Sequence, residues 1–190
     1  MRDNQTMQAL NALLQRRSAK TLTAPAPDVG ALDLILASAA AAPDHGRLRP
    51  WRFIVIEGDS LGRFGDLLAA HLRRQHPTTG EETLQRERQK AFRAPMILVV
   101  AAVCTAGGKI PVIEQVLSAA AAAQNVMLAA HALGFNSMWK TGGPAYDDEV
   151  KAALGLQAKD AIVGFMYLGT DASKPDTTPR PSWRDLVRHW

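Results

Sequence analysis

The chain has 190 residues, of which 47% are hydrophobic and 21% are charged, ordinary values for a globular protein that buries its own core. Its single cysteine, Cys104, excludes an intrachain disulfide, so nothing in the sequence asks for an oxidising compartment. The net charge of +4 is compatible with an anionic partner, either nucleic acid or a phosphorylated cofactor, without choosing between them.

Two helices joined by an extended arm are expected at the N-terminal end. Apolar residues at three- and four-residue spacing give residues 6–17 one apolar helical face. The arm 21–27 contains two prolines, which fix φ and lack an N–H donor. Asp28 is placed to cap a second helix that ends by residue 42, before a polar, basic loop over 44–50.

Four strands alternate with helices in the rest of the chain. The expected strands are 53–56, 96–103, 135–139 and 162–168, and the expected helices are 60–75, 81–92, 111–134 and 147–155. The run 96–103 is continuously apolar, which is typical of a strand buried on both faces. The helix 81–92 is charged with few core positions, which indicates a solvated cover. Helices packed on a sheet predict one α+β domain spanning residues 1–190.

The helix 111–134 is apolar almost all round, which predicts a central, buried helix. It does not predict a membrane span, because Ser118, Gln124 and His131 interrupt it and no apolar run reaches the roughly 18 residues required. The first twenty residues lack the apolar region of a signal peptide. We therefore expect a soluble, cytoplasmic protein without a membrane partner.

The last twenty residues have no helical or strand pattern. Three prolines are followed by Trp183 and Trp190. Large apolar side chains in a nonperiodic tail usually dock on another surface. The sequence thus predicts an extended C-terminal arm that packs on a partner subunit.

The segment Arg16-Arg17-Ser18, followed by Lys20, allows two interpretations. The cations could complement the negative end of the first helix. Alternatively, the planar guanidinium groups and the hydroxyl could grip a phosphate. Both interpretations stay open at this level.

Two further segments are candidates. Pro43, His45 and Arg47 lie in the basic loop, where a surface histidine is the simpler interpretation, and Trp51 beyond it is expected to anchor the core. A loop of this kind could also meet nucleic acid, but the cluster is short and no nucleic-acid motif surrounds it. The segment 139–143 follows a strand and ends in two glycines, which let a backbone approach a ligand closely or simply form a turn.

Motif searches argue against other chemistries. The sequence has no HExxH, no cysteine cluster and no GxSxG, and Gly107-Gly108-Lys109 lacks P-loop spacing. Cys104 has no evident base beside it and is expected to be a small buried hydrophobe. We therefore predict no metal site and no side-chain nucleophile.

In order and spacing these segments resemble the FMN-dependent nitroreductase family over most of the chain, especially its small, single-domain NAD(P)H nitroreductases. The matching segments are Leu13-Leu14-Gln15-Arg16-Arg17-Ser18, Pro25-Ala26-Pro27, Ile35-Leu36-Ala37, Ala42-Pro43-Asp44-His45, Pro50-Trp51-Arg52-Phe53, Gly134-Phe135, Trp139-Lys140-Thr141-Gly142, Val163-Gly164-Phe165 and Leu168-Gly169-Thr170.

The resemblance implies a three-layer α/β/α sandwich with a mixed, mainly antiparallel sheet, a homodimer, and two FMN sites at the subunit interface. It implies that Arg16, Arg17 and Ser18 bind the FMN phosphate and ribityl groups and that Lys20 lies near the pyrimidine end. The other implied cofactor-binding residues are Trp139, Lys140, Thr141, Pro43, Arg47 and His45. Of these, His45 would reach the flavin held mainly by the other subunit. Residues 129–134 match a stretch assigned to NAD(P) contact.

The implied reaction transfers hydride from NAD(P)H through FMN to a small electron-poor acceptor, a nitroaromatic or a quinone. A cation near the flavin, Lys20 or Lys140, would stabilise the reduced form. The chain departs from its relatives at Arg47, Arg49, Ala41 and Lys140, which bears on FMN affinity. The alternatives are a flavin-binding protein without reductase turnover and, with less support, a basic nucleic-acid-binding module.

Overall fold

The structure is a computed structural model that describes residues 9–171 and 178–190. Its centre is a four-stranded sheet in the order β1-β2-β4-β3. The strands are β1 (Trp51–Glu57), β2 (Met96–Ala102), β3 (Asn136–Lys140) and β4 (Ala161–Gly169). All three ladders are antiparallel, and the only parallel pairing among the described residues is an isolated bridge between Ser18 and Ser137. The sheet is thus less mixed than predicted.

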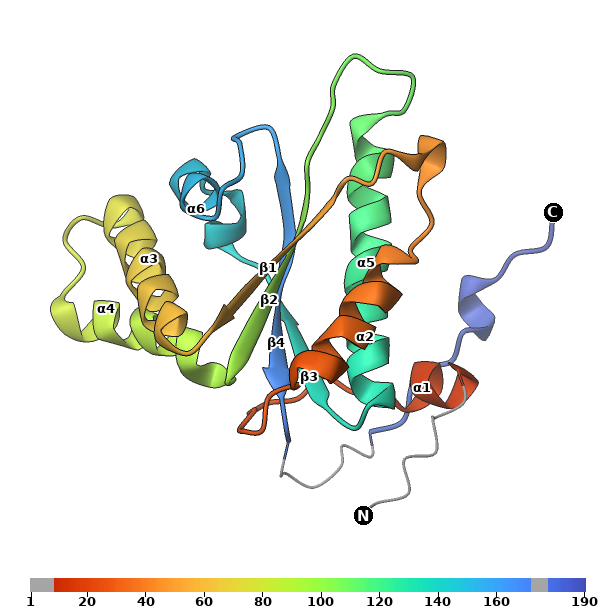
Figure 1. Ribbon diagram of the computed structural model, residues 1–190, viewed down its shortest axis with the longest axis horizontal. Helices are drawn as coiled ribbons and strands as arrows, with labels where there is room; N and C mark the ends of the chain where they lie inside the picture. Colours follow the sequence, from red (N-terminus) through yellow and green to blue (C-terminus); the bar gives the residue numbers. More distant parts are fainter. Residues whose placement is uncertain (1–8, 172–177) are drawn as a thin grey trace.

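Helices cover both faces of the sheet, which gives the three layers expected (Figure 1). One layer contains α3 (Asp59–Gln75), α4 (Glu81–Arg88) and α6 (Asp148–Ala153). The opposite layer contains α2 (Val29–Ala40) and α5 (Val112–Ala132). Because β2 lies between the layers, all seven of its residues are buried, as its unbroken apolar sequence predicted.

The alternation of side chains along β4 divides the core into two clusters. Phe165 and Tyr167 face the α3 layer, where the ring of Phe165 lies 5.3 Å from that of Phe64. Met166 and Leu168 face the α5 layer. Burying each such side chain contributes about 1.5–3 kcal/mol, so both layers are held to the sheet by apolar contact.

Most predicted ends lie within about two residues of the observed ones. The side chain of Asp28 accepts a hydrogen bond of 2.8 Å from the Ala31 amide and caps α2. Gly134 ends α5 with φ of 86°, in the region that favours glycine. The first helix is α1 (Ala9–Gln15), and its expected start at residue 6 lies outside the described residues. Trp51 is half-buried and donates to Ser118, which supports its expected role as a core anchor.

By length and composition, α5 is the one helix among the described residues that could cross a membrane. Its residues Ala122, Val126 and Ala130 are completely buried against the sheet and α2. Burial of one side against a sheet is typical of a core helix, as the sequence predicted.

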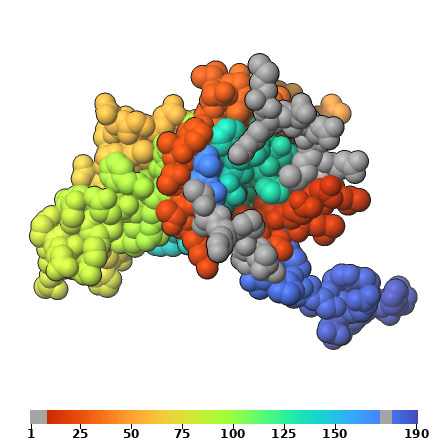
Figure 2. All heavy atoms as spheres, turned by 90° about the horizontal axis from the view of Figure 1, so that it is seen from below, coloured from red at the N-terminus to blue at the C-terminus, as the bar shows by residue number. Residues whose placement is uncertain are grey.

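Apolar side chains near both ends of the chain remain uncovered in a single chain. The apolar face of α1, with Leu10, Leu13 and Leu14, is exposed. Residues 178–190, which include the short helix η4 (Arg184–Leu186), extend away from the body as an arm with exposed Trp183 (Figure 2). The extended arm predicted from the sequence is therefore present, but one chain offers it little to pack on.

Candidate functional site

The segment after α1 lies along the edge of the sheet. The amide of Ala19 donates to the carbonyl of Ser137 on β3 at 2.9 Å, and Thr23 pairs with Thr170 at the end of β4. The amide of Leu22 donates to the carbonyl of Arg93 at 3.3 Å. These contacts place the predicted residues from Arg16 to Lys20 beside β3 and near the start of β2.

Arg16 is half-buried and has an unsatisfied nitrogen. Its Nη1 and the Nε2 of His131 are the only buried side-chain nitrogens without a hydrogen-bond partner in the part of the chain that the structure describes. Burial lowers the pKa of Arg16, and the charges of Arg180 and Arg17 add to this effect. Burial and Arg16 together lower the pKa of His131, within the stretch compared with NAD(P) contacts. An anion at Arg16 would relieve both the missing hydrogen bond and the uncompensated charge.

Arg17 has a different environment. Its Nη1 donates to the carbonyl oxygens of Leu14 at 3.1 Å and of Arg16 at 3.2 Å, at the end of α1. Its Nη2 donates to the carbonyl of Thr178 in the arm, and Arg180 also donates to the carbonyls of Leu14 and Arg16. Arg17 thus fits the helix-end interpretation, whereas Arg16 fits the ligand interpretation.

Lys140 and Thr141, at the end of β3, line a cavity of about 320 Å³. Its floor is aromatic and apolar, formed by Phe64, Leu68 and Phe165. Its polar wall consists of the side chains of Glu87, Lys90, Arg93, Lys140, Thr141 and Tyr167. An apolar floor with a mainly cationic rim suits a planar aromatic group that carries negative charge.

Trp139 does not join this cavity. Alternation along β3 directs its ring to the opposite face, where Nε1 donates to the carbonyl of Val163 at 3.2 Å. The ring lies over Gly164, where an added Cβ would come within 2.2 Å of Nε1. The side chain of Trp139 is therefore a core residue of the α5 layer.

Pro43, His45 and Arg47 lie far from Arg16 in the same chain. The Nδ1 of His45, in the short helix η1 (His45–Arg47), lies 2.6 Å from a carboxylate oxygen of Glu114. Glu114 and His131 occupy opposite ends of the 21-residue α5, which is about 30 Å long at 1.5 Å per residue. Figure 1 shows the same separation, with η1 beside the upper end of α5 and α1 beside its lower end. The ten predicted residues thus occupy four places. Lys140 and Thr141 line the cavity, and Trp139 faces the α5 layer. Arg16, Arg17, Ser18 and Lys20 lie along β3, whereas Pro43, His45 and Arg47 lie near the start of α5.

Sequence and structure comparisons agree on the family. The family model described as "Nitroreductase family" matches residues 13–170. The chain belongs to the nitroreductase family. It is 39% identical over 180 residues to "Putative NAD(P)H nitroreductase YdjA" of Escherichia coli (strain K12), covering 91% of this chain and 97% of the relative.

Two solved structures share the fold of this nitroreductase-family protein. The nitroreductase-like family protein from Bacillus cereus has a TM-score of 0.82 at 24% identity, with coverage of 97% of this chain and 96% of that one. A "putative nitroreductase in complex with fmn" from Desulfovibrio desulfuricans has a TM-score of 0.73 at 27% identity, with coverage of 96% and 97%.

The η2 side of the cavity of this nitroreductase-family protein is not predicted by the sequence pattern. Residues 81–92 were expected to be a solvated cover, but α4 ends at Arg88 and continues as the short helix η2 (Gln89–Arg93) toward the sheet. Lys90 and Arg93 thereby reach the cavity. Burial raises the pKa of Tyr167 to about 12 although the nearby Arg93 lowers it, so this phenol stays protonated. The basic residues just before β2 are the only feature of the sequence that could have indicated this side of the cavity.

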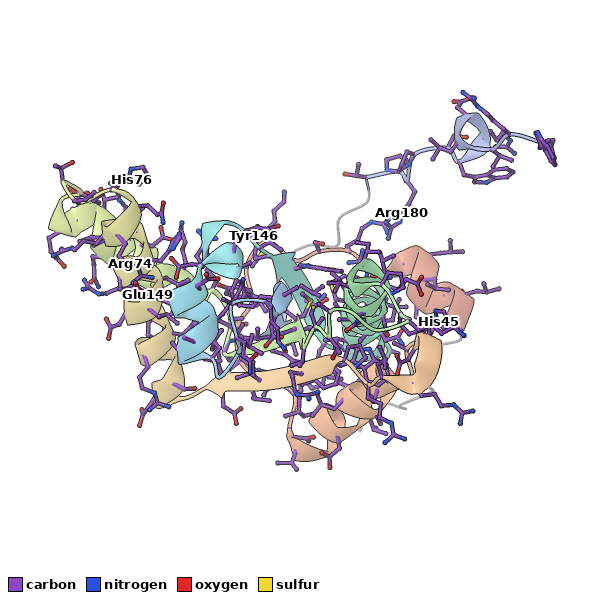
Figure 3. The ribbon with its side chains drawn as sticks, turned by 90° about the horizontal axis from the view of Figure 1, so that it is seen from above. His45, Arg74, His76, Tyr146, Glu149 and Arg180 are labelled. Atoms are coloured by element: carbon purple, nitrogen blue, oxygen red, sulfur yellow. The ribbon has the colours of Figure 1, made fainter. Side chains whose placement is uncertain are left out.

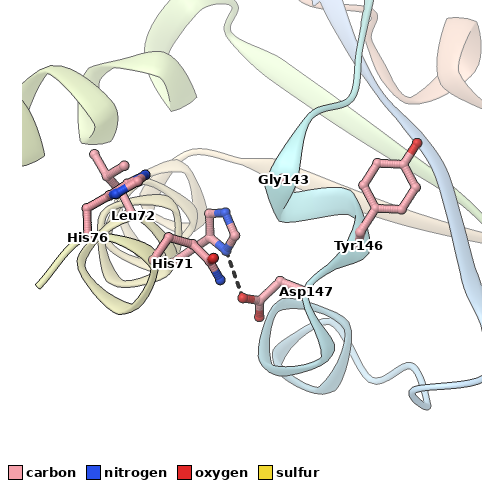
Figure 4. A pocket seen from close by; sticks show the side chains of 7 residues that line it. His71, Leu72, His76, Gly143, Tyr146 and Asp147 are labelled. Atoms are coloured by element: carbon pink, nitrogen blue, oxygen red, sulfur yellow. Dashed lines mark hydrogen bonds and ion pairs between the residues drawn. The ribbon is translucent and has the colours of Figure 1, made fainter.

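A second polar cluster joins α3 to α6 (Figure 4). The Nδ1 of His71 lies 2.7 Å from an oxygen of Asp147, whose other oxygen accepts from the Val150 amide and from Arg74. Burial alone would raise the pKa of Asp147, but these three hydrogen bonds lower it well below its usual range. His71 and Gly143 line both the 320 Å³ cavity and a cavity of about 440 Å³ outside it. The cluster of His71, Arg74 and Asp147 therefore fixes the wall between the two cavities.

Figure 3 shows this second cluster on the other side of the molecule from His45. His76, Arg74 and Glu149 are on the α3 and α6 side, whereas His45 and Arg180 are on the side of α5. Among the described residues, no three His, Cys, Asp or Glu side chains are grouped as metal ligands. Cys104 is buried, and burial raises the pKa of its thiol, so it is a small core residue rather than a reactive thiolate.

Proposed function

We propose that this protein is an FMN-dependent oxidoreductase that transfers hydride from NAD(P)H to a small electron-poor acceptor of the nitroaromatic or quinone type. The observation that carries the proposal is the buried, unpartnered Nη1 of Arg16, which needs an anion. The similar Escherichia coli protein is named as an NAD(P)H nitroreductase, and the Desulfovibrio desulfuricans structure contains FMN.

The chain offers suitable groups for both ends of FMN. Arg16 and Ser18 would hold the phosphate and ribityl groups, with Arg17 behind them and Lys20 toward the ring. Lys140 and Thr141 would meet the ring at the cavity, where Lys90 and Arg93 add positive charge. When bound, FMN supplies the hydride chemistry. The chain's cations would favour negative charge on the ring, and the apolar floor would exclude water.

A complete site requires a second copy of the chain, so we propose a homodimer. The exposed side of α5 carries Ile113 and Leu117, which are 62% and 58% exposed. If two such helices pack antiparallel about a two-fold axis, each N-terminal end lies beside the partner's C-terminal end. Pro43, His45 and Arg47 of one subunit would then approach Arg16 of the other. The arm 178–190 would pack on the partner.

We propose that residues 1–190 form one FMN-binding domain. The enzyme would be cytoplasmic, without a membrane or nucleic-acid partner. NAD(P)H would reach the cavity from solvent, and the acceptor would follow it. Residues 129–134 remain candidates for the NAD(P)H contact.

An absorbance spectrum of the purified protein tests the proposal. We expect a yellow protein with one FMN per chain, bleached by NADPH or NADH without oxygen and restored by a quinone. A colourless protein that ignores added FMN would contradict it. A yellow protein that neither nucleotide reduces would instead be a flavin-binding protein without turnover, and strongly salt-dependent binding to DNA or RNA would favour the nucleic-acid alternative.

A further inference from the structure

A carboxylate on α5 restrains the imidazole that the proposed function places beside the partner's flavin. His45 lies in a surface loop, and its side chain is 63% exposed. Its Nδ1 nevertheless lies 2.6 Å from Oε2 of Glu114, a distance typical of a charge-assisted hydrogen bond. An ionised carboxylate only accepts hydrogen bonds, so Nδ1 carries the proton and Nε2 is the ring nitrogen directed away from Glu114.

Stability does not explain this pair. The side chain of Glu114 is 40% exposed, and exposed ion pairs contribute little to stability. Glu114 is in the first turn of α5, where the helix end alone favours a carboxylate. That effect does not require contact with a side chain 69 residues away in sequence. The contact with Glu114 also fixes the orientation of the His45 ring, which a favourable charge at the helix end would not do.

The backbone of the same loop is fixed by the next turn of α5. The hydroxyl of Ser118 donates to the carbonyl of Pro43 at 2.6 Å and accepts from Nε1 of Trp51 at 2.9 Å. Ser118 is buried, so both hydrogen bonds are shielded from water. Glu114 and Ser118, one helical turn apart, thus hold the ring and the backbone of one loop from a single rigid element.

The loop conformation requires such support. Gly46, Arg47 and Arg49 have φ of 74°, 55° and 48°, in the left-handed region. For a residue other than glycine this conformation is unfavourable and persists only where the surroundings impose it. Ile110, just before α5, packs against Gly46, where an added Cβ would come within 3.1 Å of its side chain. The start of α5 therefore imposes a single shape on the loop that carries His45.

We propose that Glu114 is a positioning residue that orients His45 so that Nε2 points toward the flavin bound by the second subunit. This inference rests on the proposed function, in which His45 serves the partner's flavin. The pair lies beside the exposed Ile113 and Leu117 of the proposed interface. Dimer formation would remove water from the pair and strengthen its hydrogen bond.

A double-mutant cycle on the full-length protein tests this role, with FMN affinity measured by flavin fluorescence. We expect H45A and E114A each to weaken FMN binding about 10- to 100-fold, the range for one hydrogen bond that involves a charged group. H45A/E114A should be no weaker than H45A, because Glu114 acts through His45. E114Q should recover most of the affinity, since its amide oxygen can still accept from Nδ1–H.

The matched control is E82A. Glu82 is also in the first turn of a helix, α4, and its side chain is exposed. E82A should leave FMN affinity unchanged. A second measurement, the ¹⁵N chemical shifts of the His45 ring, reports the tautomer directly. The proton should reside on Nδ1 in the wild-type protein and in E114Q, and lose that preference in E114A.

Additive losses for H45A and E114A, or full affinity in E114A, would overturn the inference while FMN binding and reductase activity stand. Wild-type affinity in H45A would overturn it too, since His45 would have no role for Glu114 to support. A wild-type protein that binds no FMN would overturn the proposed function itself. Sedimentation of each variant should show the wild-type oligomeric state. A change in FMN affinity then reflects the His45 ring and not loss of the dimer.

Discussion

Arg16 and Arg17 are adjacent in sequence, yet their guanidinium groups have opposite hydrogen-bonding states. Nη1 of Arg17 donates to the carbonyl oxygens of Leu14, Gln15 and Arg16 at the end of α1. Arg16 keeps one buried nitrogen without an acceptor. Leaving a buried donor unsatisfied costs about 1–3 kcal/mol, and more when the group is charged. Such a cost is expected where a ligand supplies the missing acceptor.

Replacing Arg16 should therefore lower the affinity for FMN without lowering the free energy of unfolding of the apoprotein. We expect R16M to unfold in urea at least as stably as the wild-type apoprotein, because the substitution removes an unpaired, partly buried charge. Its affinity for FMN should fall about 10- to 100-fold, the range for a charged hydrogen bond. Its affinity for riboflavin, which lacks the phosphate, should change little. Fluorescence titration with both flavins measures this.

The neighbouring substitution R17M is the control. It removes hydrogen bonds to the end of α1 and to Thr178, so it should destabilise the apoprotein and affect FMN less than R16M does. Equal losses of riboflavin and FMN affinity in R16M would contradict a phosphate contact at Arg16.

The sequence could not separate these two arginines. Their order along the chain predicts two cations at a helix end, and both interpretations satisfy that pattern. The separation depends on partners distant in sequence: the carbonyl of Thr178 contacts Arg17, whereas burial near His131 affects Arg16. The same holds for Trp139, whose orientation depends on Gly164 across the sheet.

At the scale of elements, Asp147 connects two helices through one carboxylate. It caps α6 through the Val150 amide and accepts from His71 and Arg74 of α3. Its pKa is lowered, so its contribution to stability is present above the ordinary value of 3.8 and is lost as the pH falls below that value. The carboxylate thus stabilises the protein in its ionised form.

We expect D147N to lower the free energy of unfolding by about 2 kcal/mol at pH 7. This is less than the roughly 3–5 kcal/mol for breaking a fully buried pair, because Arg74 is partly exposed and asparagine can still cap α6. Urea denaturation from pH 7 to pH 3 should show the difference shrinking below pH 3.8. The control D148N alters an exposed carboxylate and should cost under about 0.5 kcal/mol. A difference that grows with acidity would refute this assignment.

Element types were predictable because each has a local cause. The unbroken apolar run of β2 reports burial on both faces, and Asp28 and Asp147 mark the starts of α2 and α6 through their caps. The function of η2 was not predictable. Its only completely buried residue is Ala91, too small to produce an apolar pattern, and its approach to the cavity is set by packing against α3.

At the scale of the whole molecule, one chain leaves large apolar side chains exposed, which the proposed homodimer would cover. Leu10 and Leu14 of α1, Ile113 and Leu117 of α5, and Trp183 of the arm are all exposed. Exposed apolar side chains that gather on a protein surface often mark a protein–protein interface. In one chain, His45 and Arg16 lie far apart. Formation of the proposed dimer would cover the exposed apolar side chains and also bring His45 of one subunit toward Arg16 of the other, which would complete the FMN site.

Leu117 offers the sharpest test of that link. In a two-fold dimer it occurs twice, and each buried leucine contributes about 1.5–3 kcal/mol, so L117E should convert the dimer into a folded monomer. That monomer should bind FMN at least 10-fold more weakly, because the partner's His45 is missing. Sedimentation and flavin titration measure both effects. A70E, on an exposed position of α3 in the opposite layer, adds the same charge and should remain dimeric and yellow. A monomeric L117E with wild-type FMN affinity would instead show that the site is complete within one chain.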